Sequence, residues 1–298
     1  MVNVIASPNV PDAQRGTGRI HLRYEDVAQD GRPRLEPLAH GISAAVWDGP
    51  IRRLDVESIV AKGIIPILTR IVIEANDGPF AVDAPMDATG CYEGAHAKIK
   101  TGERLYLNMW ADITAPIGRT ILPGPSNSGE RVAVGRMYAE HVFTKPFSAK
   151  DQRQVAVDEL ASFEGVPGRL IEPRAYASVV DLSDYRSIDE SFAQPCSPIA
   201  FGMRHTDSNQ HVNSLVYFGL FEEAALSALS SRGRNTQVMA RAIEIAYRKP
   251  SFAGQLMQPC VRLGESDDGV HAACLLVPVG ADPNDLSQAS VYAHLVMR

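Results

Sequence analysis

Polar residues suited to acid–base chemistry cluster between positions 207 and 223 of the 298-residue chain. Four of them stand at every second position: Asp207, Asn209, His211 and Asn213. Tyr217 and Glu223 follow on a mostly apolar segment with a helical pattern. A polar cluster that leads into a buried helix is costly unless its members have polar partners. Capping the helix would need one such residue rather than four, so we interpret the set as a functional site.

These residue types fit chemistry at a carbonyl group. The first N–H groups of a helix and the positive end of its dipole can hold an oxygen as it gains negative charge. We expect the backbone amides at 212–214, which belong to Val212, Asn213 and Ser214, to supply this oxyanion site. Asp207, together with Glu223, would handle proton transfer or nucleophilic attack. Asn209 and His211 would position water or a thioester. The alternative is that Asp207 and Asn209 only cap the helix.

The cluster resembles the signature of the hot-dog-fold acyl-thioester enzymes. It is most similar to that of the double-hot-dog acyl-carrier-protein thioesterases, D-x-N-x-H-V-N-N…Y…E, with Ser214 in place of the second Asn of the N-N pair. Ala246-Tyr-Arg-Lys-Pro-Ser resembles the E-Y-R-R-x-C segment of that family. Ser251 therefore stands at the family's cysteine, and Arg248 lies in the same segment. The resemblance implies that Tyr217, Ser251 and Arg248 contact the substrate. An unassisted hydroxyl is a far poorer nucleophile than a thiolate at neutral pH, so we expect that Ser251 is not an acyl-enzyme nucleophile.

A second resemblance concerns polyketide pathways. Asn209-Gln-His-Val-Asn-Ser-Leu-Val-Tyr and Phe221-Glu-Glu-Ala-Ala resemble the leinamycin-pathway family of bifunctional acyltransferase/decarboxylases, which is also a double-hot-dog family. Gly41-Ile-Ser-Ala-Ala-Val-Trp is similar to an early segment of that family. This resemblance implies decarboxylation of a malonyl-type thioester and loading of a carrier protein. The two resemblances together imply an acyl-thioester enzyme of fatty-acid, polyketide or other secondary metabolism.

The elements around the motif predict an α+β unit. A helix from about 213 to 229, apolar on nearly every side, follows a polar turn at 205–211. Alternating runs at 237–249 and 289–297 predict strands, and further strands are predicted at 271–279 and, as a short one, at 198–204. A helix of this kind has to be buried, so we expect an antiparallel sheet that wraps around it.

The first half repeats the same plan of elements without residue-level identity. Asp48-Gly-Pro predicts the start of a helix at 51–62, with Asp48 as its N-cap. Strands are predicted at 64–75, 104–114 and 131–143, a loop at 123–129 and a connector at 145–195. We therefore expect a double hot dog. Residues 1–180 would form the first unit with the connector, and 181–298 the unit that carries the D-x-N-x-H-x-N motif.

Composition limits the other function classes. The chain is 45% hydrophobic and 21% charged with a net charge of −6, which excludes long disorder and disfavours a general nucleic-acid or anionic-membrane binder. No apolar run is long enough to span a bilayer, and the first residues do not resemble a secretory signal. Four scattered cysteines fit reduced thiols. We expect a cytoplasmic protein, either a monomeric pseudo-dimer or a homodimer.

We expect neither a metal nor a nucleotide cofactor. Glu222 and Glu223 have no histidine at ligand spacing on their helix, and phosphate-binding glycine motifs are absent. Coenzyme A or phosphopantetheine enters only as part of the substrate, so the expected partners are acyl-CoA and acyl carrier protein. Five basic residues after the helix form either a solvated face or a phosphate site: Arg232, Arg234, Arg241, Arg248 and Lys249.

Two further functions stay open as alternatives. A polyketide dehydratase also uses a double hot dog, but its H-x-x-x-G-x-x-x-x-P segment is missing from this sequence. A non-catalytic acyl-binding protein would keep the fold without the chemistry. The intact set of acid, amide, imidazole and phenol side chains argues against that alternative.

Overall fold

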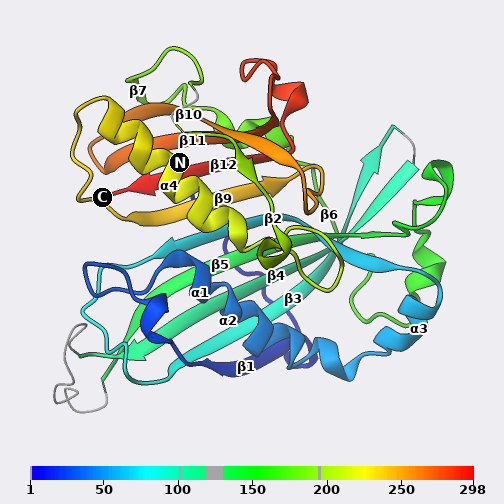
Figure 1. Ribbon diagram of the computed structural model, residues 1–298. Coiled ribbons are helices and arrows are strands. Elements are labelled where there is room, and N and C mark those ends of the chain that lie inside the picture. The colour runs from blue at the N-terminus through cyan, green and yellow to red at the C-terminus, as the bar shows by residue number, and fades with distance from the viewer. Residues whose placement is uncertain (1, 101, 119–129, 194–195) are drawn as a thin grey trace. The chain divides into compact units, whose positions relative to one another are not determined.

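A computed structural model describes residues 2–100, 102–118, 130–193 and 196–298 (Figure 1). The predicted loop at 123–129 lies outside these residues. The chain divides into two compact units. The N-terminal unit comprises Val4–Arg174, and the C-terminal unit comprises Ala175–Arg298 together with the first residues of the chain. Each unit consists of one antiparallel sheet and helical segments packed on it.

The sheet of the N-terminal unit has the strand order β1-β3-β4-β5-β2, with short β6 parallel to β3. Its strands are β1 (Arg15–Ile20), β2 (Ile65–Ala75), β3 (Met86–Ile99), β4 (Gly102–Pro116), β5 (Arg131–Thr144) and β6 (Arg169–Leu170). The predicted strands at 64–75, 104–114 and 131–143 are confirmed as β2, β4 and β5. β1 and β3 were not predicted; each contains two glycines, which weaken the strand pattern. A Cβ at Gly90 of β3 would lie 2.7 Å from the Val46 side chain, so this strand needs glycine where the helix approaches.

The helical segment on this sheet lies earlier in the chain than predicted. It consists of α1 (Leu35–Leu38), α2 (His40–Ile42) and a π-helical turn (Ser43–Trp47). The helix predicted at 51–62 is reduced to a 3-10 turn (Ile51–Arg53) and α3 (Val56–Ala61). Asp48 ends a helical turn rather than starting one, because its amide donates to the Ser43 carbonyl at 2.9 Å. Pro37 and Gly41 lower the helical signal of the true segment.

The sheet of the C-terminal unit has the order β9-β12-β11-β10-β7, with β8 on the outer side of β10. Its strands are β7 (Arg186–Ser187), β8 (Ile199–Ala200), β9 (Ala240–Tyr247), β10 (Leu256–Ser266), β11 (Gly269–Pro278) and β12 (Val291–Met297). The strands predicted at 237–249, 271–279 and 289–297 are confirmed as β9, β11 and β12, and the short strand predicted at 198–204 as the two-residue β8. β10 was not predicted because Pro259 interrupts its pattern. Outer neighbours contact β10 only in short stretches, so a residue without an N–H is tolerated there.

The long helix α4 (Val216–Ser231) runs over this sheet and contacts β10, β11 and β12 (Figure 1). One face of α4 is buried: Tyr217, Phe218, Leu220, Phe221, Ala224, Ala225, Ala228 and Leu229. Burial of each large side chain contributes about 1.5–3 kcal/mol, so this face anchors the helix. The opposite stripe stays half-buried or exposed, and includes Val216, Gly219 and Glu223. The predicted burial of the helix is thus confirmed for one face only.

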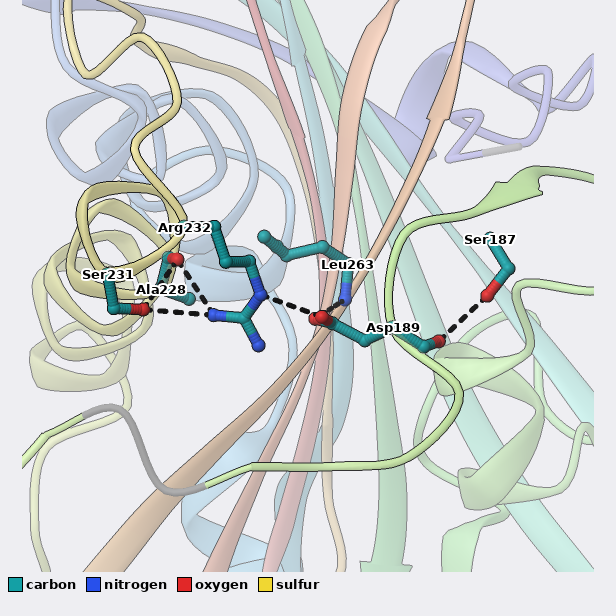
Figure 2. Close-up of polar contacts among 6 residues, drawn as sticks. All are labelled: Ser187, Asp189, Ala228, Ser231, Arg232 and Leu263. Atoms are coloured by element: carbon teal, nitrogen blue, oxygen red, sulfur yellow. Dashed lines mark hydrogen bonds and ion pairs between the residues drawn. The ribbon is translucent and has the colours of Figure 1, made fainter.

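A polar latch fixes the C-terminal end of α4 (Figure 2). The Arg232 guanidinium donates to Asp189 Oδ1 at 2.7 Å and to the Ala228 carbonyl at 2.7 Å. Asp189 Oδ2 accepts from the Leu263 amide of β10 at 2.9 Å. A cation that contacts the last carbonyls of a helix also opposes the negative end of its dipole. The connector residue Asp189 therefore ties the end of α4 to the sheet.

The connector covers the other face of the same sheet. A 3-10 turn (Tyr176–Val180) and Phe192 pack on side chains of β9 to β12, including Ala246, Leu275 and Tyr292. All four cysteines are free thiols. Within the described residues, no helix has the length and apolar character that crossing a membrane requires.

Candidate functional site

The motif residues form a tight hairpin just before α4. The Asp207 amide donates to the His211 carbonyl at 3.0 Å, and the Asp207 carbonyl accepts from the Gln210 amide at 3.0 Å. Gln210 has φ of 64° and is the only non-glycine residue in the described ranges with positive φ. This is a three-residue hairpin loop with a left-handed last residue. Asp207 and His211 close it as a pair, so their side chains leave it on the same side.

The three polar side chains of the hairpin differ in exposure. Asp207 and His211 are half-buried, and Asn209 is exposed at the tip. Asp207 Oδ1 accepts from the Asn209 amide at 2.9 Å, while no hydrogen bond engages Oδ2 within the described chain. The His211 ring packs edge-on against Phe252, with ring centroids 5.0 Å apart. One carboxylate oxygen and the imidazole therefore stay available for chemistry beside each other.

The amides at the helix start are not equally available. The Val212 amide donates to the Ser251 carbonyl and the Asn213 amide to the His205 carbonyl, both at 2.8 Å. Asn213 Oδ1 accepts from the Leu215 amide at 2.9 Å, so Asn213 makes the capping contact that Asp207 and Asn209 do not make. The Ser214 amide has no partner among the residues that the structure covers. Of the three amides expected to form the oxyanion site, only the N–H of Ser214 is therefore without a partner in the described part of the chain.

Three hydroxyl side chains, those of Ser251, Tyr217 and Tyr247, lie near the start of α4. Ser251 is fully buried, and its Oγ has no hydrogen-bond partner of standard geometry in the described part of the chain. Burial raises the pKa of Tyr217, and the neighbouring Ser251 hydroxyl and backbone offset part of that rise. The Tyr247 hydroxyl donates to the Ser214 carbonyl at 3.0 Å, and its ring lies edge-on to Tyr217. The predicted site residues do not include Tyr247, although it adjoins Arg248 in the segment that ends at Ser251.

Two predicted site residues lie away from this corner. Glu223 is exposed on α4, seven residues beyond Val216 and thus about 10 Å further along the helix. The Arg248 guanidinium donates to the carbonyls of Ser287 at 2.6 Å and Ala289 at 3.0 Å. Val212, a third predicted contact, has a buried side chain in the core. The structure therefore brings the hairpin, Ser214, Tyr217 and Ser251 together, without Glu223 and Arg248.

The five predicted basic residues do not form one phosphate site. Arg232 belongs to the latch at the end of α4. Arg234 is ion-paired with Glu265 at 2.9 Å, and Arg241 is buried in β9. Arg248 is exposed and bonds to backbone carbonyls, and Lys249 is exposed without an ion pair in the described residues. Nor does any group of three histidine, cysteine or carboxylate side chains within the described ranges fit a metal ion.

The N-terminal unit builds the same hairpin 179 residues earlier. The Ala28 amide donates to the Arg32 carbonyl at 2.7 Å, and the Gly31 amide to the Ala28 carbonyl at 2.9 Å. The bridge between Val27 and Pro33 repeats that between Thr206 and Val212, and a helical segment follows in both units. Gly31, with φ of 80°, takes the place of Gln210. The two halves therefore share a local backbone motif that sequence identity does not reveal.

The side chains of the two hairpins differ where chemistry is expected. Ala28, Asp30, Arg32 and Arg34 stand at the positions of Asp207, Asn209, His211 and Asn213. Asp26 corresponds to His205, and each side chain accepts from the amide three residues before it. His205 is therefore a structural residue. The same backbone forms without the acid, amide and imidazole, so folding does not require those residue types at 207, 209 and 211.

Comparison with known proteins identifies the fold. The chain matches no protein-family model, and no curated protein matches it. Similar solved structures include an oleoyl thioesterase (putative) from Lactobacillus plantarum, with a TM-score of 0.59 and 14% identity over 95% of this chain and 96% of that one. An acyl-ACP thioesterase from Bacteroides thetaiotaomicron gives 0.57 and 14% over 96% and 99%. A 12:0-ACP thioesterase from Umbellularia californica gives 0.60 and 12% over 96% and 94%. The predicted double hot-dog α+β fold is confirmed.

Proposed function

We propose that this double hot-dog chain is an acyl-thioester hydrolase whose site is the hairpin–helix corner of the C-terminal unit. The comparison of its two hairpins carries the proposal. Only the C-terminal hairpin has Asp207, Asn209 and His211, and the N-terminal hairpin folds without their equivalents. Their presence in one copy is therefore explained by chemistry rather than by the fold.

The geometry supports hydrolysis by water. The Ser214 N–H, at the positive end of α4, would hold the carbonyl oxygen as the tetrahedral intermediate forms. The Asp207–His211 pair would take a proton from water as the water oxygen bonds to the carbonyl carbon. The C–S bond then breaks, and the same proton passes to the leaving thiolate. Asn209 would orient the water or the thioester from the tip of the hairpin.

Ser251 has a positioning role in this proposal. Its Oγ is buried, and no histidine or carboxylate in the described residues makes a hydrogen bond with it. A hydroxyl without a base is a poor nucleophile at neutral pH. Its carbonyl accepts from the Val212 amide at 2.8 Å, so Ser251 helps to hold the segment between the hairpin and α4 in place. We therefore propose that no acyl-enzyme forms on Ser251.

The finer proposals concern substrate and pathway. Acyl transfer uses the same carbonyl site as hydrolysis, with a carrier thiol in place of water. Decarboxylation and a polyketide pathway rest on the resemblance of residues 209–217 to the acyltransferase/decarboxylase family. Residues 41–47 also resemble that family, but packing is enough to explain the glycine at position 41. A Cβ there would lie 3.0 Å from the Ile113 side chain. Hydrolysis is therefore the function that the geometry supports best.

One assay tests these proposals together. The protein is incubated with acetyl-, malonyl-, methylmalonyl- and lauroyl-CoA, with and without a carrier protein, and thiol release, carbon dioxide and loaded carrier are measured. Asp207→Asn should keep the hairpin and lower the rate by about 10²–10⁴-fold. Asp30→Asn, in the N-terminal hairpin, is the matched control and should leave the rate unchanged. Wild-type activity in Asp207→Asn, or no thioester loss with any substrate, contradicts the proposal.

A further inference from the structure

Two loops of the C-terminal unit join into one surface around the hairpin. The first spans residues 202–211, and the second follows β9 at 248–255. Beside the first loop, the Phe201 amide donates to the Gln255 carbonyl at 3.0 Å, and the Gly254 amide donates to the Phe201 carbonyl at 2.7 Å. The His211 ring contacts Phe252. We call these two loops, with the adjoining Leu256, the loop surface.

The loop surface exposes large apolar side chains. Met203 is 81% exposed, Leu256 50% and Phe252 41%. Arg204 and Lys249 are exposed beside them, and neither forms an ion pair with any residue that the structure describes. Apolar side chains flanked by unpaired charges are typical of surfaces that bind another protein.

The N-terminal unit offers an internal comparison for this surface. Its equivalent loops are residues 23–32 and 76–85, and Tyr24, 96% exposed, stands at the position of Met203. There the cations are paired, Arg23 with Asp26 and Arg32 with Asp77. An exposed apolar residue is thus common to the loops of both units, whereas among the described residues of these loops, cations without an ion pair, such as Arg204 and Lys249, occur only in the unit with the motif.

Formal charge separates the two surfaces further. The loops of the C-terminal unit hold three cations and one carboxylate, for a net charge of +2. The equivalent loops of the N-terminal unit hold two cations and five carboxylates, for a net charge of −3. The whole chain carries −6, so the positive surface around the motif is a local exception. Its charge complements that of an acidic partner.

We propose that the loop surface docks an acidic carrier protein that presents the acyl group on a thiol arm. This proposal rests on the hydrolase function proposed above and selects a protein-borne substrate over free acyl-CoA. Arg204 and Lys249 stand on different loops beside exposed Met203 and Phe252, as at the rim of a small protein interface. Such contacts give weak, salt-sensitive and rapid association.

The test compares two forms of one acyl group. Lauroyl-CoA and lauroyl-loaded acyl carrier protein are each assayed with the wild type and with Arg204→Glu/Lys249→Glu. We expect the double variant to raise KM for the loaded carrier about tenfold or more with kcat unchanged, and to leave KM for lauroyl-CoA unchanged. Added salt should raise KM for the carrier in the wild type and have less effect in the variant.

Matched controls come from the N-terminal unit. Arg34→Glu removes an exposed cation, and Tyr24→Ala truncates the equivalent of Met203. Both should leave KM for the carrier unchanged, whereas Met203→Ala should raise it. An equal rise of KM for both substrates in the double variant would show that the cations bind coenzyme A phosphates, and no rise for either would show that the surface is not used. Both results overturn the proposal.

Binding measured without turnover keeps the two proposals distinguishable. Isotope-labelled holo carrier protein is titrated with the wild type and with the double variant, and the carrier's amide signals are followed by NMR. Shifts with the wild type that are lost in the variant support docking even if neither thioester is hydrolysed, in which case only the hydrolase proposal fails. An absence of shifts with the wild type overturns docking whatever the hydrolysis rates are.

Discussion

At the residue scale, Asp207 and His211 supply a carboxylate and an imidazole that the equivalent residues of the N-terminal hairpin do not have. The N-terminal hairpin keeps the same backbone hydrogen bonds with Ala28 and Arg32 at these positions. The variant Asp207→Ala/His211→Arg therefore transplants a pair that the fold already accepts. We expect it to keep the circular dichroism spectrum and the thermal midpoint within a few degrees, and to lose at least about 10²-fold in thioesterase rate. Unfolding of this variant would show that the pair is structural.

Ser251 permits a second test at the residue scale. Its buried Oγ has no partner of standard geometry in the described residues, so Ser251→Ala removes little hydrogen bonding and relieves an unsatisfied polar group. We expect a free energy of unfolding equal to that of the wild type or higher by up to about 1 kcal/mol, measured by urea denaturation. Most activity should remain, and intact-mass spectra with substrate should show no adduct. A serine-linked acyl group would overturn the positioning role and restore a covalent mechanism.

The residue types of the candidate site could be predicted from the sequence, but its geometry could be predicted only in part. The spacing of 207, 209, 211 and 213 located the hairpin. Which amide stays free depends on long-range contacts, because the Ser251 carbonyl occupies the Val212 amide and the His205 carbonyl the Asn213 amide. The placement of Glu223 on the exposed stripe of α4 also depends on packing against the sheet. A nearly uniform apolar pattern does not say which face is buried.

At the element scale, strands and helices could be predicted where the pattern of apolar residues along the sequence is regular. Alternation predicts β9 and β12, and runs of β-branched and apolar residues predict β2 and β11. No such pattern marks β1 and β3, where glycines admit the helical segment, and the helical segment 35–47 is interrupted by Pro37 and Gly41. The repeated hairpin stayed hidden as well, because its hydrogen bonds are between backbone atoms and place few demands on residue type.

The half-exposed stripe of α4 leads to a prediction about Gly219. A Cβ built at this position meets no atom within 4 Å, so packing does not require glycine there. Replacement of glycine by alanine in a helix interior stabilises by about 0.8–1 kcal/mol. We expect Gly219→Ala to raise the free energy of unfolding by about that amount, measured by urea denaturation. A lower free energy of unfolding in this variant would show that the space beside Gly219 is needed for packing.

At the scale of the whole molecule, each unit contains a buried neutral histidine. Burial lowers the pKa of His294 to about 3 in the C-terminal unit and that of His141 to about 4 in the N-terminal unit. His294 also lies against His271, with a ring nitrogen distance of 3.0 Å, and His271 contacts Asp268 at 3.0 Å. Burial lowers the pKa of His271 too. The hydrogen bond between His271 and His294 needs one ring nitrogen as donor and the other as acceptor. Protonation of either ring would bury a positive charge, and protonation of the acceptor nitrogen would remove the bond.

The sign of the resulting pH dependence follows from linkage. An unfolded histidine titrates near pH 6.5, so between that pH and the lowered folded values the unfolded chain binds more protons. The stabilisation is complete above pH 6.5 and declines as the pH falls, by about 1.4 kcal/mol per pH unit for each such histidine. We expect the urea midpoint to fall from pH 7 to pH 5, where most carboxylates are still ionised. His294→Gln keeps a group able to bond to His271. In this variant the slope of the unfolding free energy against pH should correspond to about one fewer proton taken up on unfolding. A midpoint that is constant over this range would contradict the buried neutral state, whereas an unchanged slope in His294→Gln would place the acid sensitivity elsewhere.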